Sequence, residues 1–177
     1  MIRAALLAVA LLFAGNAGAR ESLPAAVAAD APGLSQRGSG TYRWFGLEIY
    51  TATLWTAGTA GAAPDFGQPL ALMLRYARTL KGGAIAERSA DEIEKLALAT
   101  PGQLTAWRDA MAVLFPDVAR GTTLTGLHLP GRGARFYRDG QPIGEIADAA
   151  FTRAFFSIWL HPRTRAPELR AALLGEG

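Results

Sequence analysis

The chain has 177 residues, half of them hydrophobic, with 18 basic and 15 acidic side chains. This length suits one domain with a core of its own. The absence of cysteine excludes disulfides, thiol chemistry and cysteine-ligated zinc or iron–sulfur centres. Because the arginines are spread singly along the chain and form no concentrated basic stretch, we expect no nucleic-acid partner.

Residues 1–19 have the pattern of a cleavable signal peptide. Arg3 supplies a positive charge, an uncharged apolar run follows over residues 4–14, and Ala17-Gly18-Ala19 fits the small-x-small site of a signal peptidase. The apolar run is shorter than the roughly 20 residues that a membrane-spanning helix needs. We therefore predict export to the periplasm, residues 20–177 as a single domain, and no stable membrane span after cleavage. A retained N-terminal anchor is the alternative.

The next part of the chain is expected to enter a sheet. Residues 20–36 are predicted to be a mobile lead-in with at most one strand near its end, and Gly38-Ser39-Gly40 to interrupt the chain. Tyr, Trp, Ile and Thr are frequent after that, which is typical of strands. We expect either two strands, over residues 41–45 and 47–56, or one strand bent at Gly46.

Alternating apolar patterns predict four further strands, listed by range as 70–78, 122–129, 134–138 and 141–146. Asp139-Gly140 is a strong signal for a two-residue hairpin turn. Because neighbouring hairpins produce antiparallel pairs, the sheet is expected to be antiparallel.

Helical spacing predicts four helices in two pairs. Ser89-x-x-Glu92 has the form of a capping box and predicts a helix from Ser89 to about Ala99, followed by a second helix that stops before Pro116. Asp148 is expected to cap a third helix, and Pro167 to begin a fourth. Strands combined with helices that must bury one face indicate an α+β domain.

Motifs for metal, phosphate, dinucleotide and serine-hydrolase chemistry do not occur in the sequence. His128 and His161 lie far apart and are interpreted as structural residues. We therefore predict no metal site and no cofactor, and we assign no catalytic residue. A Ser-His-Asp triad assembled from distant segments remains open.

The remaining candidate is an apolar pocket with a few polar anchors. Five residues are predicted to share one face of the sheet beside helices rich in Phe and Trp, namely Thr41, Arg43, Tyr50, Arg75 and Tyr76. An arginine in such a pocket would bind a carboxylate or phenolate through paired hydrogen bonds. Alternatively, Arg43 and Arg75 reach to the sheet edge or form ion pairs, for example with Glu48.

Four segments follow one another in order over nearly all of residues 20–177, namely 38–55, 115–121, 136–160 and 167–175. Together these segments resemble the bacterial chalcone-isomerase-like family. The resemblance implies a large antiparallel β-sheet with a layer of α-helices on one face and a ligand cleft between them. It also implies that Arg43, on the strand after the Gly-x-Gly turn, reaches the ligand, and that Tyr50 closes the following strand.

Departures from the plant enzymes of this fold bear on activity. Those enzymes place a tyrosine at the start of the first helix after the central strand and a lysine one turn later. Residues 81–88 contain no tyrosine here, and Arg88 roughly occupies the lysine position. Ser157 retains a hydroxyl at a threonine position of the late helix. Loss of a donor to the developing enolate would cost on the order of 2.7–4 kcal/mol.

Together, the signal-peptide pattern and the resemblance predict an exported protein that binds a hydrophobic or amphipathic small molecule, such as a fatty acid, without true chalcone isomerase activity. The expected ligand-binding residues are Thr41, Arg43, Tyr50, Tyr76 and Ser157. Two alternatives stay open. One is an isomerase or intramolecular lyase acting on an unknown enone-like substrate. The other is a structural or interaction module whose cleft is filled by its own side chains.

Overall fold

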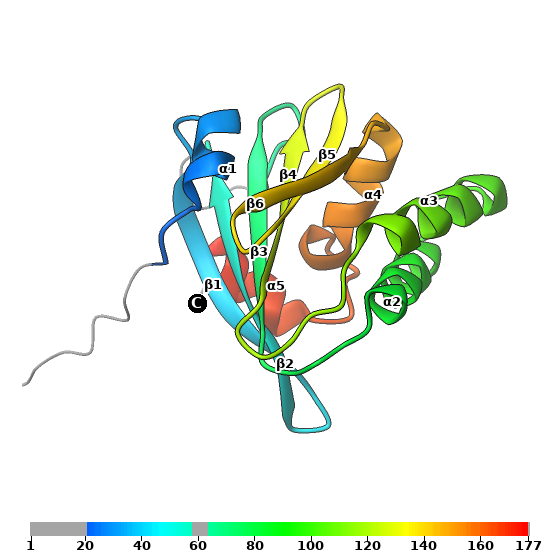
Figure 1. Ribbon diagram of the computed structural model, residues 1–177, viewed down its shortest axis with the longest axis horizontal. Coiled ribbons are helices and arrows are strands. Elements are labelled where there is room, and N and C mark those ends of the chain that lie inside the picture. Colours follow the sequence, from blue (N-terminus) through cyan, green and yellow to red (C-terminus); the bar gives the residue numbers. More distant parts are fainter. Residues whose placement is uncertain (1–20, 58–63, 177) are drawn as a thin grey trace, which may run out of the picture.

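The computed structural model describes residues 21–57 and 64–176. These residues form a six-stranded antiparallel sheet in which strand order follows chain order. The strands are β1 (Ser35–Trp44), β2 (Leu47–Thr56), β3 (Leu70–Tyr76), β4 (Thr123–Leu129), β5 (Gly133–Arg138) and β6 (Gln141–Ile146). Figure 1 shows this sheet between helices of unequal size on its two sides. The predicted α+β fold and its antiparallel sheet are confirmed.

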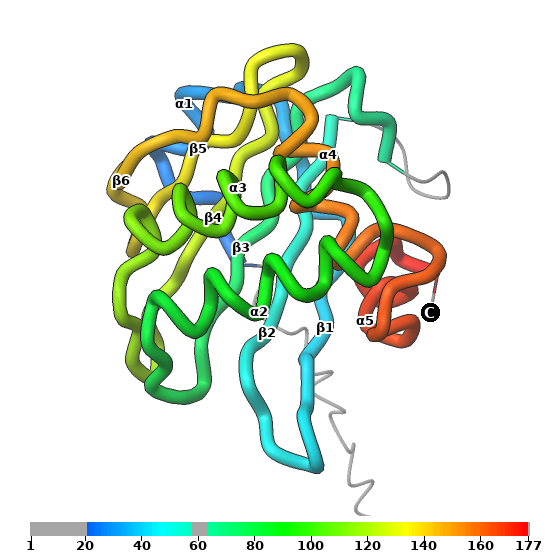
Figure 2. The backbone as a smooth tube through the Cα atoms, turned by 90° about the vertical axis from the view of Figure 1, so that its right-hand side faces the viewer, coloured from blue at the N-terminus to red at the C-terminus, as the bar shows by residue number. Residues whose placement is uncertain are grey.

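Within the described residues, five helices accompany the sheet: α1 (Ala25–Asp30), α2 (Gly82–Lys95), α3 (Pro101–Leu114), α4 (Ala149–Leu160) and α5 (Pro167–Leu174). Figure 2 shows α2 and α3 side by side, with α5 beside β1. Helices α2 to α5 contribute side chains to the main core, whereas α1 packs on the opposite face of the sheet. None of the helices in the described ranges is long and apolar enough to cross a membrane.

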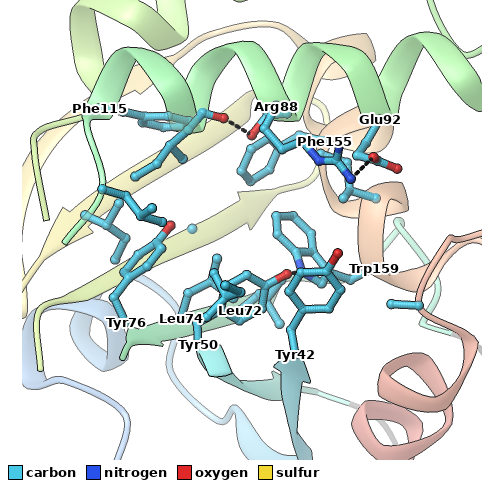
Figure 3. A pocket seen from close by; sticks show the side chains of 18 of the residues that line it. Tyr42, Tyr50, Leu72, Leu74, Tyr76, Arg88, Glu92, Phe115, Phe155 and Trp159 are labelled. Atoms are coloured by element: carbon cyan, nitrogen blue, oxygen red, sulfur yellow. Dashed lines mark hydrogen bonds and ion pairs between the residues drawn. The ribbon is translucent and has the colours of Figure 1, made fainter. Parts of the chain in front are cut away.

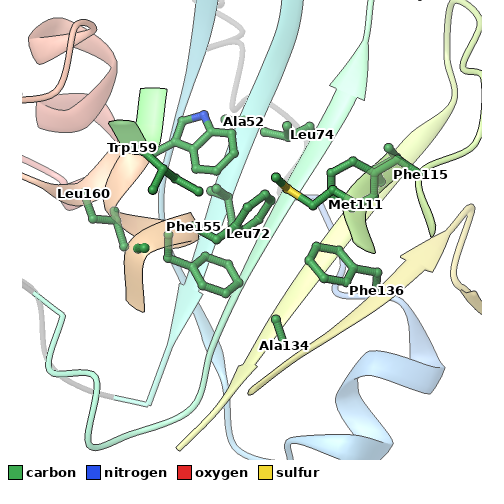
Figure 4. Packing of buried hydrophobic residues seen from close by; sticks show 14 of the residues in the cluster. Ala52, Leu72, Leu74, Met111, Phe115, Ala134, Phe136, Phe155, Trp159 and Leu160 are labelled. Carbon is green, nitrogen blue, oxygen red and sulfur yellow. The ribbon is translucent and has the colours of Figure 1, made fainter. Parts of the chain in front are cut away.

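The main core lies between the sheet and the helix layer. Phe155 of α4 contacts the rings of Phe115, Phe136 and Trp159, with centroids 5.3–6.1 Å from its own. Figure 4 shows this aromatic group together with Leu72 and Met111. Burial of such large side chains is the main favourable contribution to folding. A smaller apolar cluster under α1 includes Val27, Trp55 and Met73.

Gly38 and Gly40 lie inside β1 and do not interrupt it, which corrects the expected break. A Cβ on Gly38 would lie 2.1 Å from the carbonyl oxygen of Ala172 in α5, and one on Gly40 would lie 2.9 Å from a Leu169 methyl. These glycines are therefore required because the backbone of α5 approaches β1 closely. The lead-in prediction also missed α1.

The predicted start of the first long helix at Ser89 is wrong. Helix α2 begins seven residues earlier, at Gly82, whose N–H donates to Oδ1 of Asp117 at 2.9 Å. The Ser89 hydroxyl instead donates to the carbonyl of Ile85 at 2.8 Å, within the helix. The N-terminus of α2 is thus capped by the carboxylate of Asp117, from a distant loop, and not by the Ser89-x-x-Glu92 motif.

The helix that follows Asp148 and the last helix agree with the predictions. Asp148 accepts hydrogen bonds from the N–H groups of Ala150 and Phe151, and Gly175 ends α5 in the left-handed conformation.

Residues 1–19, where the signal peptide is predicted, lie outside the described residues. Both the signal peptide and the single domain from residue 20 onward stay predictions.

Candidate functional site

A cavity of about 370 Å³ lies between the sheet and the helix layer. Figure 3 shows it enclosed by α2 on one side and by side chains of the first three strands on the other. Most of the surrounding side chains are apolar, including Leu72, Leu74, Phe115, Phe136, Phe155 and Ile158. The volume falls within the range of small-molecule sites. The cleft is therefore not filled by the protein's own side chains, contrary to one of the alternatives above.

Three tyrosines from adjacent strands form a row along the sheet side of the cavity. Tyr42 of β1 pairs in register with Tyr50 of β2, which pairs with Tyr76 of β3. The rings of Tyr42 and Tyr50 stack at 5.2 Å, and those of Tyr50 and Tyr76 meet edge to face at 5.9 Å. Cross-strand aromatic pairs stabilise a sheet, and here they also place three hydroxyls beside an apolar space (Figure 3).

The hydroxyls of Tyr50 and Tyr76 differ in their bonding. Tyr50 accepts a hydrogen bond from Nε1 of Trp159 at 3.0 Å. Tyr76 is buried and lines the cavity, but its hydroxyl has no hydrogen-bond partner among the described residues. Burial raises the pKa of both hydroxyls well above their ordinary value. Both groups are therefore neutral donors, and the Tyr76 hydroxyl is free to bind a ligand oxygen.

The charged groups that line the cavity gather around Glu92 of α2. Its carboxylate lies 2.8 Å from Arg88, 3.5 Å from Lys95 and 3.6 Å from Arg165. Arg88, Glu92 and Arg165 all line the cavity. The Arg88 guanidinium also lies over the ring of Trp44, 5.4 Å from its centroid. Because three cations surround one carboxylate, this end of the cavity is suited to a further anion.

A family model described as chalcone isomerase-like matches residues 17–175. The chain belongs to the chalcone isomerase-like family. An uncharacterized protein of Haemophilus influenzae is 31% identical to it over 139 residues, which is 78% of this chain and 67% of that protein.

A solved structure shares the fold of this chalcone isomerase-like protein. The crystal structure of an Arabidopsis thaliana fatty-acid binding protein matches with a TM-score of 0.60 and 12% sequence identity. The match covers 82% of this chain and 89% of that one. At this identity the likeness establishes the fold, and it confirms the fold that the family resemblance had implied.

The structure places two of the five expected ligand residues at the cavity, Tyr50 and Tyr76. Thr41 and Arg43 do not line it. Thr41 instead bonds to Thr51 at 3.2 Å, and Arg43 lies 3.6 Å from Glu48 in an exposed ion pair. The prediction that Thr41 and Arg43 share a sheet face with Tyr50 and Tyr76 is therefore wrong. The alternative, an ion pair between Arg43 and Glu48, is observed.

The correction for β1 follows from strand geometry. Successive side chains of a strand point to opposite faces, so Tyr42 and Trp44 face the cavity while Arg43 does not. The alternation in the sequence predicts that Arg43 lies on the opposite face of β1 from Tyr42 and Trp44. Which of these two faces is turned toward the helices depends on the register with β2, which shifts between Tyr42 and Arg43.

Ser157 does not line the cavity, although it is buried in α4. Phe155, Ile158 and Trp159 do line it, and their spacing of three and four residues defines one helical face. Ser157 lies off that face, which corrects its expected place beside a ligand. The helix period alone, counted from these three apolar positions, already separates Ser157 from them.

Three lining residues were not predicted as site residues, namely Tyr42, Trp44 and Arg165, and the expected cation was placed on β1 instead of α2. Arg88 was recognised only as the residue at the lysine position of the plant pattern, and it lines the cavity together with Arg165. Its spacing provided a signal: Arg88 and Glu92 are four residues apart on α2, so they share a face with Ile85 and Ser89.

His128 is a structural residue. Its two ring nitrogens lie 2.9 Å from the Thr152 hydroxyl and 2.9 Å from the Phe66 carbonyl. Because a carbonyl can only accept, Nε2 carries the proton and Nδ1 accepts from Thr152. His161 accepts from the N–H of Arg163 at the end of α4. Within residues 21–57 and 64–176, no group of three or more potential metal ligands is clustered.

Proposed function

We propose that this protein binds an amphipathic organic acid, such as a fatty acid, in the cavity between sheet and helices. The observation that supports it most directly is an apolar cavity of about 370 Å³ whose polar end carries Arg88 and Arg165. The apolar tail would lie against Leu72, Leu74 and Phe155. The name of the Arabidopsis neighbour, a fatty-acid binding protein, supports the same ligand class.

The energetics favour a ligand with a long tail and a small acidic head. Each methylene moved from water into the cavity contributes about 0.8 kcal/mol. A carboxylate near Arg88 gains charge-assisted hydrogen bonds, and Arg88 has further N–H donors besides those directed at Glu92. The Tyr76 hydroxyl offers a neutral donor to a ligand oxygen within the apolar part.

Native mass spectrometry of the purified protein tests this proposal. We expect a bound acid in the wild-type protein, and a bound fraction reduced at least about tenfold in Arg88→Gln because a charge-assisted contact is lost. Arg43→Gln is the matched control, because Arg43 is exposed, paired with Glu48 and outside the cavity lining. Retention of the acid by Arg88→Gln, or its loss from Arg43→Gln alone, would contradict the proposed anchor.

The proposal includes the absence of true chalcone isomerase activity. Residues 81–88 contain no tyrosine at the position where the plant enzymes have one. Without that donor the developing enolate is less stabilised in the transition state. A chalcone cyclisation assay is expected to show the rate of buffer alone, and any turnover abolished by Tyr76→Phe would contradict this part of the proposal.

One observation favours the second candidate, an isomerase acting on another enone-like substrate. The Tyr76 hydroxyl lines the same cavity as Arg88 and has no partner among the described residues. A neutral tyrosine donor and a cation could together stabilise an enolate. Incubation with a panel of enones, followed by NMR, distinguishes the candidates: an isomerised product that depends on both residues supports the enzyme.

Export to the periplasm belongs to the same proposal. It is supported by the Arg3, apolar-run and Ala17-Gly18-Ala19 pattern of residues 1–19. Expression of the full chain in a bacterial host should yield a periplasmic protein whose N-terminus begins near Arg20. A cytoplasmic protein that retains Met1 or Ile2 would contradict it.

A further inference from the structure

The hairpin that joins β1 to β2 projects beyond the rest of the sheet. Tyr50 pairs with Tyr76, the last residue of β3, so residues 43–48 extend past the end of the neighbouring strand. Figures 1 and 2 show this hairpin protruding below the body of the protein. Its end is apolar: Phe45 is 89% exposed, Leu47 52% and Trp44 43%. We call these three residues the apolar tip.

The turn at the apolar tip is costly for folding. Phe45 and Gly46 both have positive φ, at 46° and 76°. The β5–β6 hairpin at the same end of the sheet has nearly the same turn, with φ of 48° at Asp139 and 79° at Gly140. Asp, Asn and Gly are the residues that suit such a turn, whereas a bulky residue is strained there. Phe45 therefore has a strained backbone conformation and an apolar side chain exposed to water, and neither stabilises the fold. This combination indicates that Phe45 contacts another molecule.

The same end of the sheet carries an excess of positive charge. Three cations there have nearby carboxylates, in the pairs Arg43–Glu48, Lys81–Asp117 and Arg138–Asp139. Arg78, which follows β3, and Arg120, which precedes β4, are exposed and have no ion-pair partner in the part of the chain that the structure describes. An exposed apolar tip with two such arginines beside it complements an anionic lipid surface.

We propose that the apolar tip inserts into the surface of an anionic lipid bilayer, with Arg78 and Arg120 contacting lipid phosphates. Trp44 belongs both to the tip and to the cavity lining, so insertion would bring one end of the cavity to the membrane. Aromatic residues flanked by arginine are favoured at the membrane–water interface. Association of two copies through this tip is opposed by the like charges of Arg78 and Arg120.

Flotation with lipid vesicles tests the proposal. Vesicles made of two parts phosphatidylcholine and one part phosphatidylglycerol are expected to bind the protein. Vesicles of phosphatidylcholine alone are expected to bind it more weakly. The double variant Phe45→Asn/Leu47→Ser should weaken binding by about tenfold or more, since two exposed apolar groups are lost. Val113→Ser is matched to Phe45 in exposure, at 91%, and lies on α3, which Figure 2 shows beyond α2 from the hairpin. It should bind like the wild type.

Folding and binding can be separated at Phe45. Because asparagine suits the turn, Phe45→Asn should keep or raise the melting temperature while it weakens vesicle binding. A loss of binding in this variant therefore cannot come from unfolding. It should also still bind the acid in the cavity, so membrane contact and ligand binding are distinguished. The proposal would be overturned if Phe45→Asn/Leu47→Ser floated with vesicles as well as the wild-type protein does. It would also be overturned if sedimentation velocity showed that the wild-type protein forms dimers, and that this variant loses the dimers but keeps its vesicle binding.

The charge contribution has its own control. Arg78→Gln and Arg120→Gln should each reduce binding to the anionic vesicles by about fivefold, with less effect at high salt. Arg132→Gln removes an exposed charge from the β4–β5 turn, at the opposite end of the sheet, and should bind like the wild type. Equal losses in all three variants would indicate attraction by net charge alone and would overturn the assigned surface.

Discussion

Trp159 donates its indole N–H to the hydroxyl of Tyr50, 3.0 Å away, and so connects α4 to the sheet at the cavity. Both residues line the cavity, and Tyr50 also contacts the two other tyrosines of the row. This bond fixes one wall of the cavity relative to the other. Its removal should therefore affect both folding and ligand binding.

The Trp159→Phe variant is expected to lose about 2 kcal/mol in the free energy of unfolding, measured by urea denaturation. The buried Tyr50 hydroxyl would lose its donor and the cavity would enlarge. Adding Tyr50→Phe to this variant should cost less than Tyr50→Phe does alone, because the bond is already broken. Strict additivity of the two changes would show that the bond contributes nothing.

Replacing Glu92 by glutamine should strengthen binding of a fatty acid by roughly tenfold. The Glu92 carboxylate occupies Arg88 and repels a second carboxylate, and its removal leaves Arg88 and Arg165 for the ligand. A fluorescent fatty-acid displacement titration measures the change. Glu87→Gln, also on α2 but paired with Arg108 away from the cavity, should leave the affinity unchanged. Weaker binding in Glu92→Gln would contradict the assignment of the anionic head to this end.

The Tyr76→Phe variant should bind the ligand several-fold more weakly while the free energy of unfolding stays the same or increases. The Tyr76 hydroxyl has no partner among the described residues, so its removal costs the folded state no hydrogen bond. Tyr137→Phe provides the contrast, because Tyr137 donates to Asp30 on the other face of the sheet. It should lower stability and leave the affinity intact. The reverse pattern would show that Tyr76 is purely structural.

Stability should decrease as pH falls below about 6.5. Burial is the main cause that lowers the pKa of His128 from its ordinary value of 6.5. Below that value the unfolded chain takes up a proton that the folded protein excludes, so the folded state loses up to about 1.4 kcal/mol per pH unit until His128 itself is protonated. Urea titrations between pH 5 and 8 measure this slope, with pH values chosen to bracket the ordinary pKa.

His128→Gln should flatten the dependence on pH, although it will lower stability throughout. Burial also lowers the pKa of His161, with the charges of Arg163 and Arg170 acting in the same direction. His161→Gln should therefore also remove part of the slope. A slope unchanged in His128→Gln would assign the dependence to other groups.

Much of the fold was predictable because it depends on local pattern. Alternation over residues 70–76 and the Asp139-Gly140 turn are signals that neighbouring residues carry. The start of α2 was not predictable in this way, because Asp117, 35 residues from Gly82, supplies its capping group. The role of Gly38 likewise depends on the approach of α5, which no local pattern encodes.

The candidate site was predictable only in part. Tyr50 and Tyr76 could be placed on one face by their alternation along β2 and β3, whereas the face of β1 depends on its register. That register directs Tyr42 and Trp44 to the cavity and leaves Arg43 outside. The cation is supplied instead by Arg88 of α2. The helix predicted from the sequence began at Ser89, so it did not include Arg88.

In the proposed complex, the cavity holds an apolar chain with an acidic head at Arg88. Isothermal titration of dodecanoic acid and of its methyl ester tests this placement, since the two ligands share the chain and differ in charge. The wild-type protein should bind the acid at least about tenfold more tightly than the ester, and Arg88→Gln should abolish that preference. Equal affinity for acid and ester in the wild-type protein, or a preference that survives in Arg88→Gln, would contradict the account.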